Sequence, residues 1–142
     1  MGYVFRHRRR VEFSETDMVG IVHFSNFFRY AEAAETAMYR ELGVSVTQGD
    51  ITFPRVHAEF DFRKPLRFEE EFDVVVEVEE VRSRSLAYAF RVENLSGEAC
   101  ARGNARGKLV VACVRKDPAT GALASVAVPA RMAELMRTPA AI

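Results

Sequence analysis

One acidic residue stands where it could attack a carbonyl group. In the stretch ETDMVGIVHFSNFFRY, residues 15–30, Asp17 precedes Gly20 by three positions, and both precede a segment with helical spacing. Gly20 allows a sharp bend after the carboxylate. A helix start exposes unpaired backbone N–H groups and about half a positive charge, which stabilise an oxygen that becomes negative. A carboxylate beside such donors can attack a carbonyl carbon or deprotonate a water that does so. The same spacing also suits an aspartate that only caps a turn.

The segment that follows predicts a long helix over residues 26–42. Its apolar side chains recur at helical spacing, namely at Phe27, Ala31, Ala34, Met38 and Leu42. Ser25 is suited to the N-cap, and Gly43 to the left-handed position after the last turn. This helix therefore presents its first turn directly after the Asp17 turn.

Most of the remaining chain alternates apolar and polar residues with a period of two, which is typical of strands. Strands are predicted over residues 3–14, 56–63, 72–81, 86–92 and 98–114, and a short helix over residues 129–136. The order is one strand, the long helix, then four strands as an antiparallel meander. We expect a single α+β domain over residues 1–142, with a sheet of about five strands wrapped around the helix. One helix covers only one face of that sheet, so we expect the other face to be solvated or paired in an oligomer.

The composition argues against several classes of protein. Twenty basic and twenty acidic residues cancel, so no net charge favours nucleic acid or a membrane surface as a partner. No apolar run approaches the roughly 20 residues of a membrane span. The first ten residues lack the apolar core of a secretory signal, and the two cysteines are read as buried thiols. We expect a cytoplasmic protein. The three histidines share no ligand spacing, so no metal is expected.

The segment SETDMVGIVHFSNFFRYAEAAETAMYRELG resembles the signature of hotdog-fold acyl-CoA thioesterases of the 4-hydroxybenzoyl-CoA thioesterase branch. The shared pattern is Asp, two residues, Gly, a β-branched pair, an aromatic residue or His, then Asn and an aromatic residue at the head of a helix. Its positions are matched by Asp17, Gly20, Ile21, Val22, His23, Phe24, Asn26 and Phe27. Weaker similarity in FPRVHAEFDFRKPLRFEEEFDV and EVRSRSLAYAFRV extends it over nearly the whole chain.

This resemblance implies a hotdog fold that assembles as homodimers or homotetramers, with active sites at the dimer interface and no metal or organic cofactor. It implies that Asp17 is the catalytic carboxylate, as nucleophile or general base, and that the backbone N–H of Phe24 polarises the thioester carbonyl. Gly20 would shape the turn, and His23 and Asn26 would line the pocket.

The expected substrate is an acyl-CoA. In relatives, arginines in the turn before the fourth strand contact CoA phosphates, which makes Arg82 and Arg84 the candidates here. Arg63 and Lys64 are weaker candidates for the same role, and all four also suit ordinary solvated turns.

Two other functions fit some of these residues. An acyl-CoA hydratase or dehydratase of the same fold needs a histidine with an acidic partner, and His23 lies near Asp17 in the sequence. A non-catalytic acyl-binding module could reuse the pocket, although an unpaired carboxylate in an apolar tunnel is costly for a pure binder.

Overall fold

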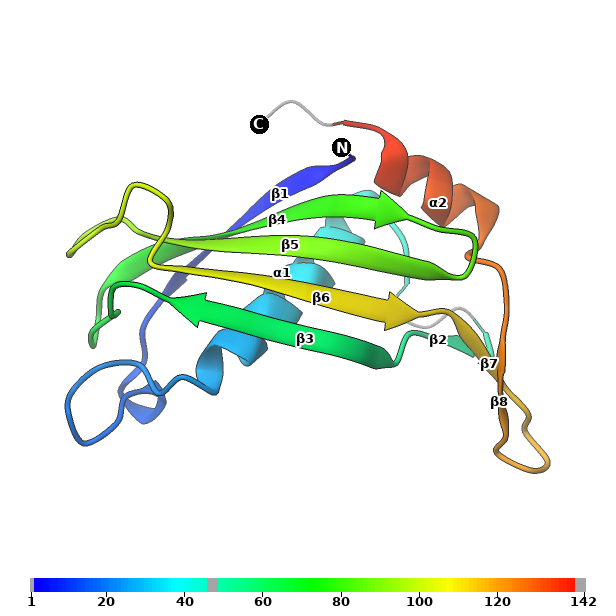
Figure 1. Ribbon diagram of the computed structural model, residues 1–142, viewed down its shortest axis with the longest axis horizontal. Coiled ribbons are helices and arrows are strands. Elements are labelled where there is room, and N and C mark those ends of the chain that lie inside the picture. The colour runs from blue at the N-terminus through cyan, green and yellow to red at the C-terminus, as the bar shows by residue number, and fades with distance from the viewer. Residues whose placement is uncertain (1, 46–48, 140–142) are drawn as a thin grey trace.

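The computed structural model describes residues 2–45 and 49–139, and its centre is one long helix lying across one face of a curved sheet (Figure 1). The sheet has five antiparallel strands in the order β1-β4-β5-β6-β3. The strands are β1 (Val4–Arg10), β3 (Arg55–Phe62), β4 (Glu71–Val81), β5 (Ser85–Asn94) and β6 (Ala105–Ala112). This is the predicted α+β hotdog arrangement, and the prediction is confirmed.

Smaller elements surround this sheet. They are the 3₁₀ turn η1 (Phe13–Glu15), the three-stranded sheet of β2 (Ile51–Thr52), β7 (Val114–Lys116) and β8 (Leu123–Ser125), and the terminal helix α2 (Ala130–Arg137). In the part of the chain that the structure describes, no helix has the length and apolar character needed to cross a membrane.

The long helix α1 (Asn26–Leu42) has the predicted bounds. Gly43 adopts the left-handed conformation that ends it, with φ of 72°. Ser25 occupies the N-cap position, but its side chain does not cap the helix; its hydroxyl contacts Nδ1 of His23 at 2.8 Å. The buried face of α1 packs on the inner side of β4 and β5, where Phe72, Val76 and Tyr88 are fully buried.

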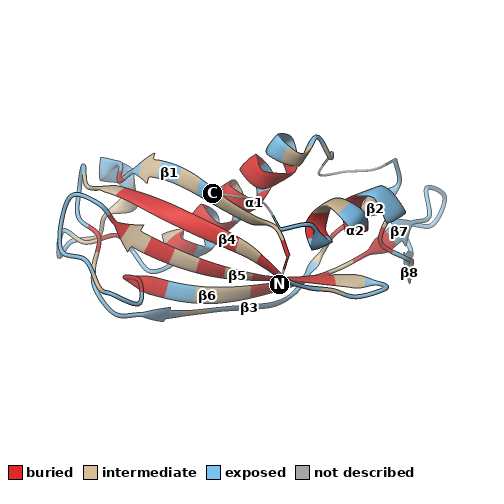
Figure 2. Ribbon diagram, turned by 90° about the horizontal axis from the view of Figure 1, so that it is seen from above, coloured by how far each residue is buried: buried red, intermediate tan, exposed pale blue. Residues whose placement is uncertain are grey.

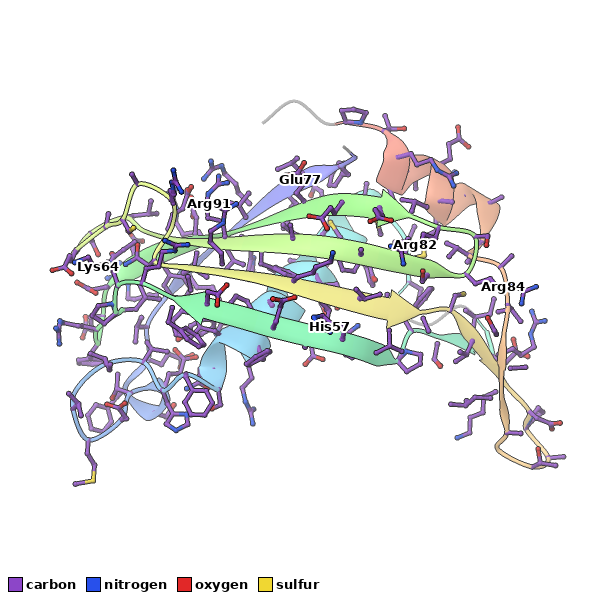
Figure 3. All side chains as sticks on the ribbon, in the orientation of Figure 1. His57, Lys64, Glu77, Arg82, Arg84 and Arg91 are labelled. Carbon is purple, nitrogen blue, oxygen red and sulfur yellow. The ribbon has the colours of Figure 1, made fainter. Side chains whose placement is uncertain are left out.

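The outer face of the sheet is covered by its own charged side chains. Arg6 bridges Asp73 at 3.4 Å and Glu93 at 2.8 Å, and Arg91 reaches Glu93 at 2.6 Å. The face without a helix therefore has internal partners for its charges, and Figure 3 shows Arg91 and Glu77 on it.

Strand β3 is the exposed edge of the sheet. Figure 2 shows it almost wholly exposed, in contrast to the largely buried β4 in the interior of the sheet. Pairing differs here from the predicted meander: β4, β5 and β6 do form one, but β3 crosses the sheet to pair with β6. β1 takes the place beside β4 instead. The meander was wrong at β3 because strand pairing depends on long-range packing, which the alternation of residues does not encode.

The predicted strand over residues 98–114 is shorter than expected. β6 begins only at Ala105, because Gly103 has φ of 97° and Asn104 is fully buried in hydrogen bonds to the preceding loop. A separate short strand, β7, begins at Val114. The inward-facing residues of the run, such as Val111 and Cys113, are buried as their parity predicted.

Candidate active site

Asp17 sits in a tight turn that orients its carboxylate. The Asp17 backbone N–H donates to the carbonyl of Ile21 at 2.8 Å, and the Gly20 N–H donates to the Asp17 carbonyl at 3.0 Å. Gly20 has φ of 89°, which explains why glycine stands there. Oδ1 of Asp17 accepts hydrogen bonds from the N–H groups of Val19 at 2.9 Å and Ile21 at 3.4 Å. Oδ2 has no hydrogen-bond donor in residues 2–45 and 49–139, so it stays available to a ligand.

Just before α1, the backbone N–H of Phe24 is unpaired in the part of the chain that the structure describes. The N–H of His23 donates to the Glu15 carbonyl at 2.9 Å, and the N–H of Ser25 donates to Nδ1 of His23 at 3.3 Å. Between them, the N–H of Phe24 has no acceptor in the described part of the chain, although the Phe24 carbonyl accepts from Phe27 at 3.2 Å. The helix start adds partial positive charge at this point. Phe24 therefore presents a donor to whatever lies in front of it.

Asp17 and Phe24 line the same cleft, which has a volume of about 430 Å³. Its walls are mostly apolar, and Arg63 and Lys64 lie at its edge; the lining residues are Asp17, Ile21, Val22, Phe24, Phe27, Phe62, Arg63, Lys64 and Pro65. The Phe62 ring lies 5.1 Å from that of Phe27 and 6.5 Å from that of Phe24. A carboxylate oxygen, an N–H donor and an apolar wall suit cleavage of an acyl group at a polarised carbonyl.

The other face of the Asp17 turn borders a second hollow of about 720 Å³. Its exposed apolar side chains are Phe13, Met18, Val19 and Phe68, with the Phe13 and Phe68 rings 5.7 Å apart. The turn therefore lies between two hollows, so the position of the Asp17 carboxylate depends on the support that the turn receives from the rest of the fold.

That support comes from Glu15, which was not singled out in the sequence. Its carbonyl accepts hydrogen bonds from the His23 N–H and from Nδ2 of Asn26, both at 2.9 Å. Its carboxylate accepts one from the Tyr30 hydroxyl at 2.9 Å. Burial and the neighbouring Glu15 raise the pKa of Tyr30, which therefore stays a donor. In the sequence, Glu15 is only an acidic residue two positions before Asp17, which is a weak signal on its own.

His23 and Asn26 lie beside the cleft but are engaged elsewhere. The His23 ring is exposed and contacts the Ser25 hydroxyl, while the Asn26 side-chain amide donates to Glu15. Neither residue is among those lining the cleft within one chain. The hydrogen bond from Asn26 instead fixes the start of α1 against the 3₁₀ turn.

Arg82 and Arg84 lie at the opposite end of the sheet from the Asp17 turn within one chain (Figure 3). Both are exposed, and Nε of Arg82 pairs with Glu80 at 2.7 Å, a bond that raises the pKa of this arginine. Lys64, a weaker candidate, lies at the cleft and also pairs with Glu98 at 3.3 Å. A single chain therefore places Arg63 and Lys64, rather than Arg82 and Arg84, beside Asp17.

A second polar cluster lies farther along α1. Glu35 is buried, with a 2.9 Å hydrogen bond from the Tyr39 hydroxyl and a close ion pair to Arg55 at the start of β3. Burial raises the pKa of Glu35, while Arg55 opposes that rise. The Tyr39 and Tyr88 hydroxyls are 2.6 Å apart. This cluster joins α1 to the edge strand. Among residues 2–45 and 49–139, no group of three or more His, Cys, Asp or Glu side chains is placed to hold a metal ion.

Similarity to known proteins identifies the chain as a thioester hydrolase with the hotdog fold. The chain belongs to the thioesterase superfamily, whose family pattern matches residues 19–101, more than half of its length. That match begins two residues after Asp17.

Known proteins resemble the chain in sequence and in structure. A protein of Aquifex aeolicus with the provisional name of an esterase is 34% identical over 91 residues, which cover 62% of this chain and 71% of that protein. A 1,4-dihydroxy-2-naphthoyl-CoA hydrolase of Prochlorococcus marinus is 27% identical over 95 residues, which cover 59% of this chain and 61% of that protein. The crystal structure of a 4-hydroxybenzoyl-CoA thioesterase variant superimposes with a TM-score of 0.82 and 20% identity, covering 94% of this chain and 98% of that one. The predictions of the family, the fold and a thioester hydrolase are confirmed.

Proposed function

We propose that the protein hydrolyses acyl-CoA thioesters at the cleft between the Asp17 turn and the start of α1. The observation that carries the proposal is the pairing of two unused groups on one cleft: Oδ2 of Asp17 and the backbone N–H of Phe24. Each is an ordinary feature alone. Together they place an attacking group and a carbonyl polariser, the two functions that acyl transfer requires, on one cleft.

In the nucleophilic route, the thioester oxygen accepts a hydrogen bond from the Phe24 N–H while Oδ2 of Asp17 attacks the carbonyl carbon. The C–S bond breaks, CoA leaves as the thiolate, and an acyl–aspartyl anhydride remains. Water then cleaves that anhydride, which releases the carboxylic acid and restores the carboxylate. In the general-base route, Asp17 removes a proton from water, and the hydroxyl oxygen attacks the same carbon. The C–S bond then breaks, and the departing CoA thiolate takes the proton from Asp17. Both routes need the same oxyanion donor, whose removal typically costs about 2.7–4 kcal/mol.

The edge strand β3 supports a homodimer. Its outer side is unpaired in the described chain, Val56 and Phe62 on this strand are exposed, and Phe28 of α1 is exposed beside it. Two copies that pair β3 with β3 about a two-fold axis would extend the sheet and bury these side chains. The same rotation exchanges the two ends of the sheet. The turn with Arg82 and Arg84 in one copy would then lie at the end where the other copy carries Asp17, which makes a shared CoA site possible.

Similar proteins support a CoA substrate. The Prochlorococcus relative is named a 1,4-dihydroxy-2-naphthoyl-CoA hydrolase, and the structural neighbour was crystallised with 4-hydroxybenzoyl-CoA in a variant with asparagine in place of an aspartate. An aspartate that can be replaced while the thioester stays bound fits a catalytic role such as the one proposed for Asp17. We place the reaction in the cytoplasm, a location that fits the two free cysteines, Cys100 and Cys113.

The test is release of free thiol from a panel of aromatic and aliphatic acyl-CoAs. Asp17→Asn should lower kcat by several orders of magnitude, because the amide is neither a nucleophile nor a base. Asp117→Asn is a matched control, since Oδ1 of Asp117 also accepts from two backbone N–H groups, those of Ala119 and Thr120, in a turn closed by a glycine. Equal, substantial turnover by the wild type and Asp17→Asn would rule out the role of Asp17. Tight binding of acyl-CoA without thiol release would point to a binding module.

A further inference from the structure

We propose that Glu15 is a positioning residue that fixes the separation between the Asp17 carboxylate and the Phe24 N–H, an assignment whose catalytic meaning rests on the proposed function. Glu15 touches neither the cleft nor the reacting atoms. It lies at the end of η1, two residues before Asp17, and its backbone and side chain bind different parts of the site.

The Glu15 carbonyl holds the segment that carries Phe24. It accepts one hydrogen bond from the His23 N–H and one from Nδ2 of Asn26, both at 2.9 Å. These donors flank Phe24 on either side. The two bonds therefore fix the orientation of the peptide unit between His23 and Phe24. The N–H of this unit has no acceptor in residues 2–45 and 49–139. The same bonds connect this peptide unit to the Asp17 turn, whose two ends are joined by the bridge between Thr16 and Val22.

The Glu15 carboxylate anchors the same residue to the core. Oε1 accepts from the Tyr30 hydroxyl and from the Glu12 N–H, both at 2.9 Å, and Oε2 lies 3.5 Å from Nη2 of Arg9. Arg9 points to the inner side of β1, and its guanidinium lies 5.3 Å from the centre of the Tyr30 ring. Tyr30 is only 1% exposed, and the Glu15 side chain is 15% exposed. A partly buried ion pair beside a buried hydroxyl is less screened by salt than a pair on the surface.

Neither secondary-structure propensity nor core packing alone requires a glutamate with these contacts at position 15. The Asp17 turn projects between two hollows, and its carboxylate oxygen Oδ1 is held only by N–H groups of the turn itself. Glu15 connects this turn to β1 through Arg9 and to α1 through Tyr30 and Asn26. Loosening it would let the carboxylate and the N–H drift apart without unfolding either element.

Two pairs of variants separate positioning from stability. Glu15→Gln removes the partly buried charge, and its control is Glu12→Gln, because the Glu12 carboxylate lies 3.9 Å from the same arginine but is 70% exposed. Tyr30→Phe removes the hydroxyl on Glu15, and its control is Tyr39→Phe, which removes a buried hydroxyl bonded to Glu35 on the same helix. Each variant is assayed for thiol release and for Tm.

We expect Glu15→Gln and Tyr30→Phe each to lower kcat by about tenfold with little change in KM, less than the roughly hundredfold that a misplacement of 1 Å can cause. Because Glu15→Gln weakens the Tyr30–Glu15 hydrogen bond by removing the charge and Tyr30→Phe deletes it, their effects on kcat should be less than additive in the double variant. Tyr39→Phe should lower Tm but leave kcat unchanged, and Glu12→Gln should change neither. If Tyr30→Phe and Tyr39→Phe lose kcat only in proportion to Tm, the role of Glu15 is structural and the proposal is overturned.

A readout independent of turnover is the NMR signal of the Phe24 backbone amide in the wild type and the four single variants. It should shift in Glu15→Gln and Tyr30→Phe and stay in place in the two controls. If the wild type hydrolyses no thioester while this shift is seen, the proposed function fails and the positioning survives. If the wild type is active through Asp17 while neither the amide signal nor kcat responds to Glu15→Gln, the positioning fails alone.

Discussion

The backbone donor at Phe24 can be removed by one substitution, Phe24→Pro. Proline has no N–H, and it is tolerated here because Phe24 precedes the first residue of α1, Asn26, and its N–H makes no hydrogen bond in the described chain. The Phe24 carbonyl, which accepts from the Phe27 N–H at 3.2 Å, is retained. The change therefore deletes one donor at the cleft and no structural hydrogen bond.

The size of the effect follows from the number of donors. The neighbouring N–H groups of His23 and Ser25 are already engaged, so Phe24 supplies the one unpaired backbone donor found at this point of residues 2–45 and 49–139. Loss of one oxyanion donor typically lowers kcat by about 10²–10³-fold, or about 2.7–4 kcal/mol. KM should change less, because the donor acts on charge that develops only in the transition state.

The assay is thiol release by Phe24→Pro beside Phe24→Ala. The alanine variant keeps the N–H and loses the ring that packs at 6.5 Å from Phe62 and 4.6 Å from His23, so it should mainly raise KM. Circular dichroism and Tm establish that both variants are folded. A folded proline variant with the kcat of the alanine variant would refute the assignment of the Phe24 N–H as the carbonyl polariser.

Three further predictions concern the assembly and the rest of the site. Arg55→Met should lower the free energy of unfolding at pH 7 by about 3–5 kcal/mol, because Glu35 is left buried without its cation. Burial already raises the pKa of Glu35 in the folded state, and the loss of Arg55 should raise it further. The deficit should therefore shrink as the pH falls through this raised pKa towards about 4.3, the usual pKa of glutamate. Urea unfolding that shows the same deficit at pH 7 and pH 5 would contradict this reading. Val56→Glu on the exposed edge of β3 should convert dimers to monomers in light scattering, and an unchanged mass would place the interface elsewhere. Replacing Arg82 and Arg84 together with alanine should raise KM for an acyl-CoA but not for the matching acyl-pantetheine, whereas an equal rise for both would exclude contact with the CoA nucleotide.

Local sequence was sufficient for the elements that depend on neighbours in the chain. The helix over residues 26–42 was predicted with its observed bounds, because apolar spacing and Gly43 act over a few residues. The Asp17–Gly20 turn was predictable for the same reason, since a glycine with positive φ has a recognisable position. The alternating runs located the strands but not their partners.

Tertiary structure decided how these elements meet. The sequence by itself determined the long helix, the turn that carries Asp17, and the order in which they occur. Only the folded chain placed β3 beside β6 and brought Arg9 to Glu15 and Tyr30. It also placed Arg82 and Arg84 at the end of the sheet opposite the Asp17 turn. The physical reason is that spacing along a chain fixes short-range backbone geometry. Contacts between distant segments depend on how the whole core packs, and a single sequence does not display that packing.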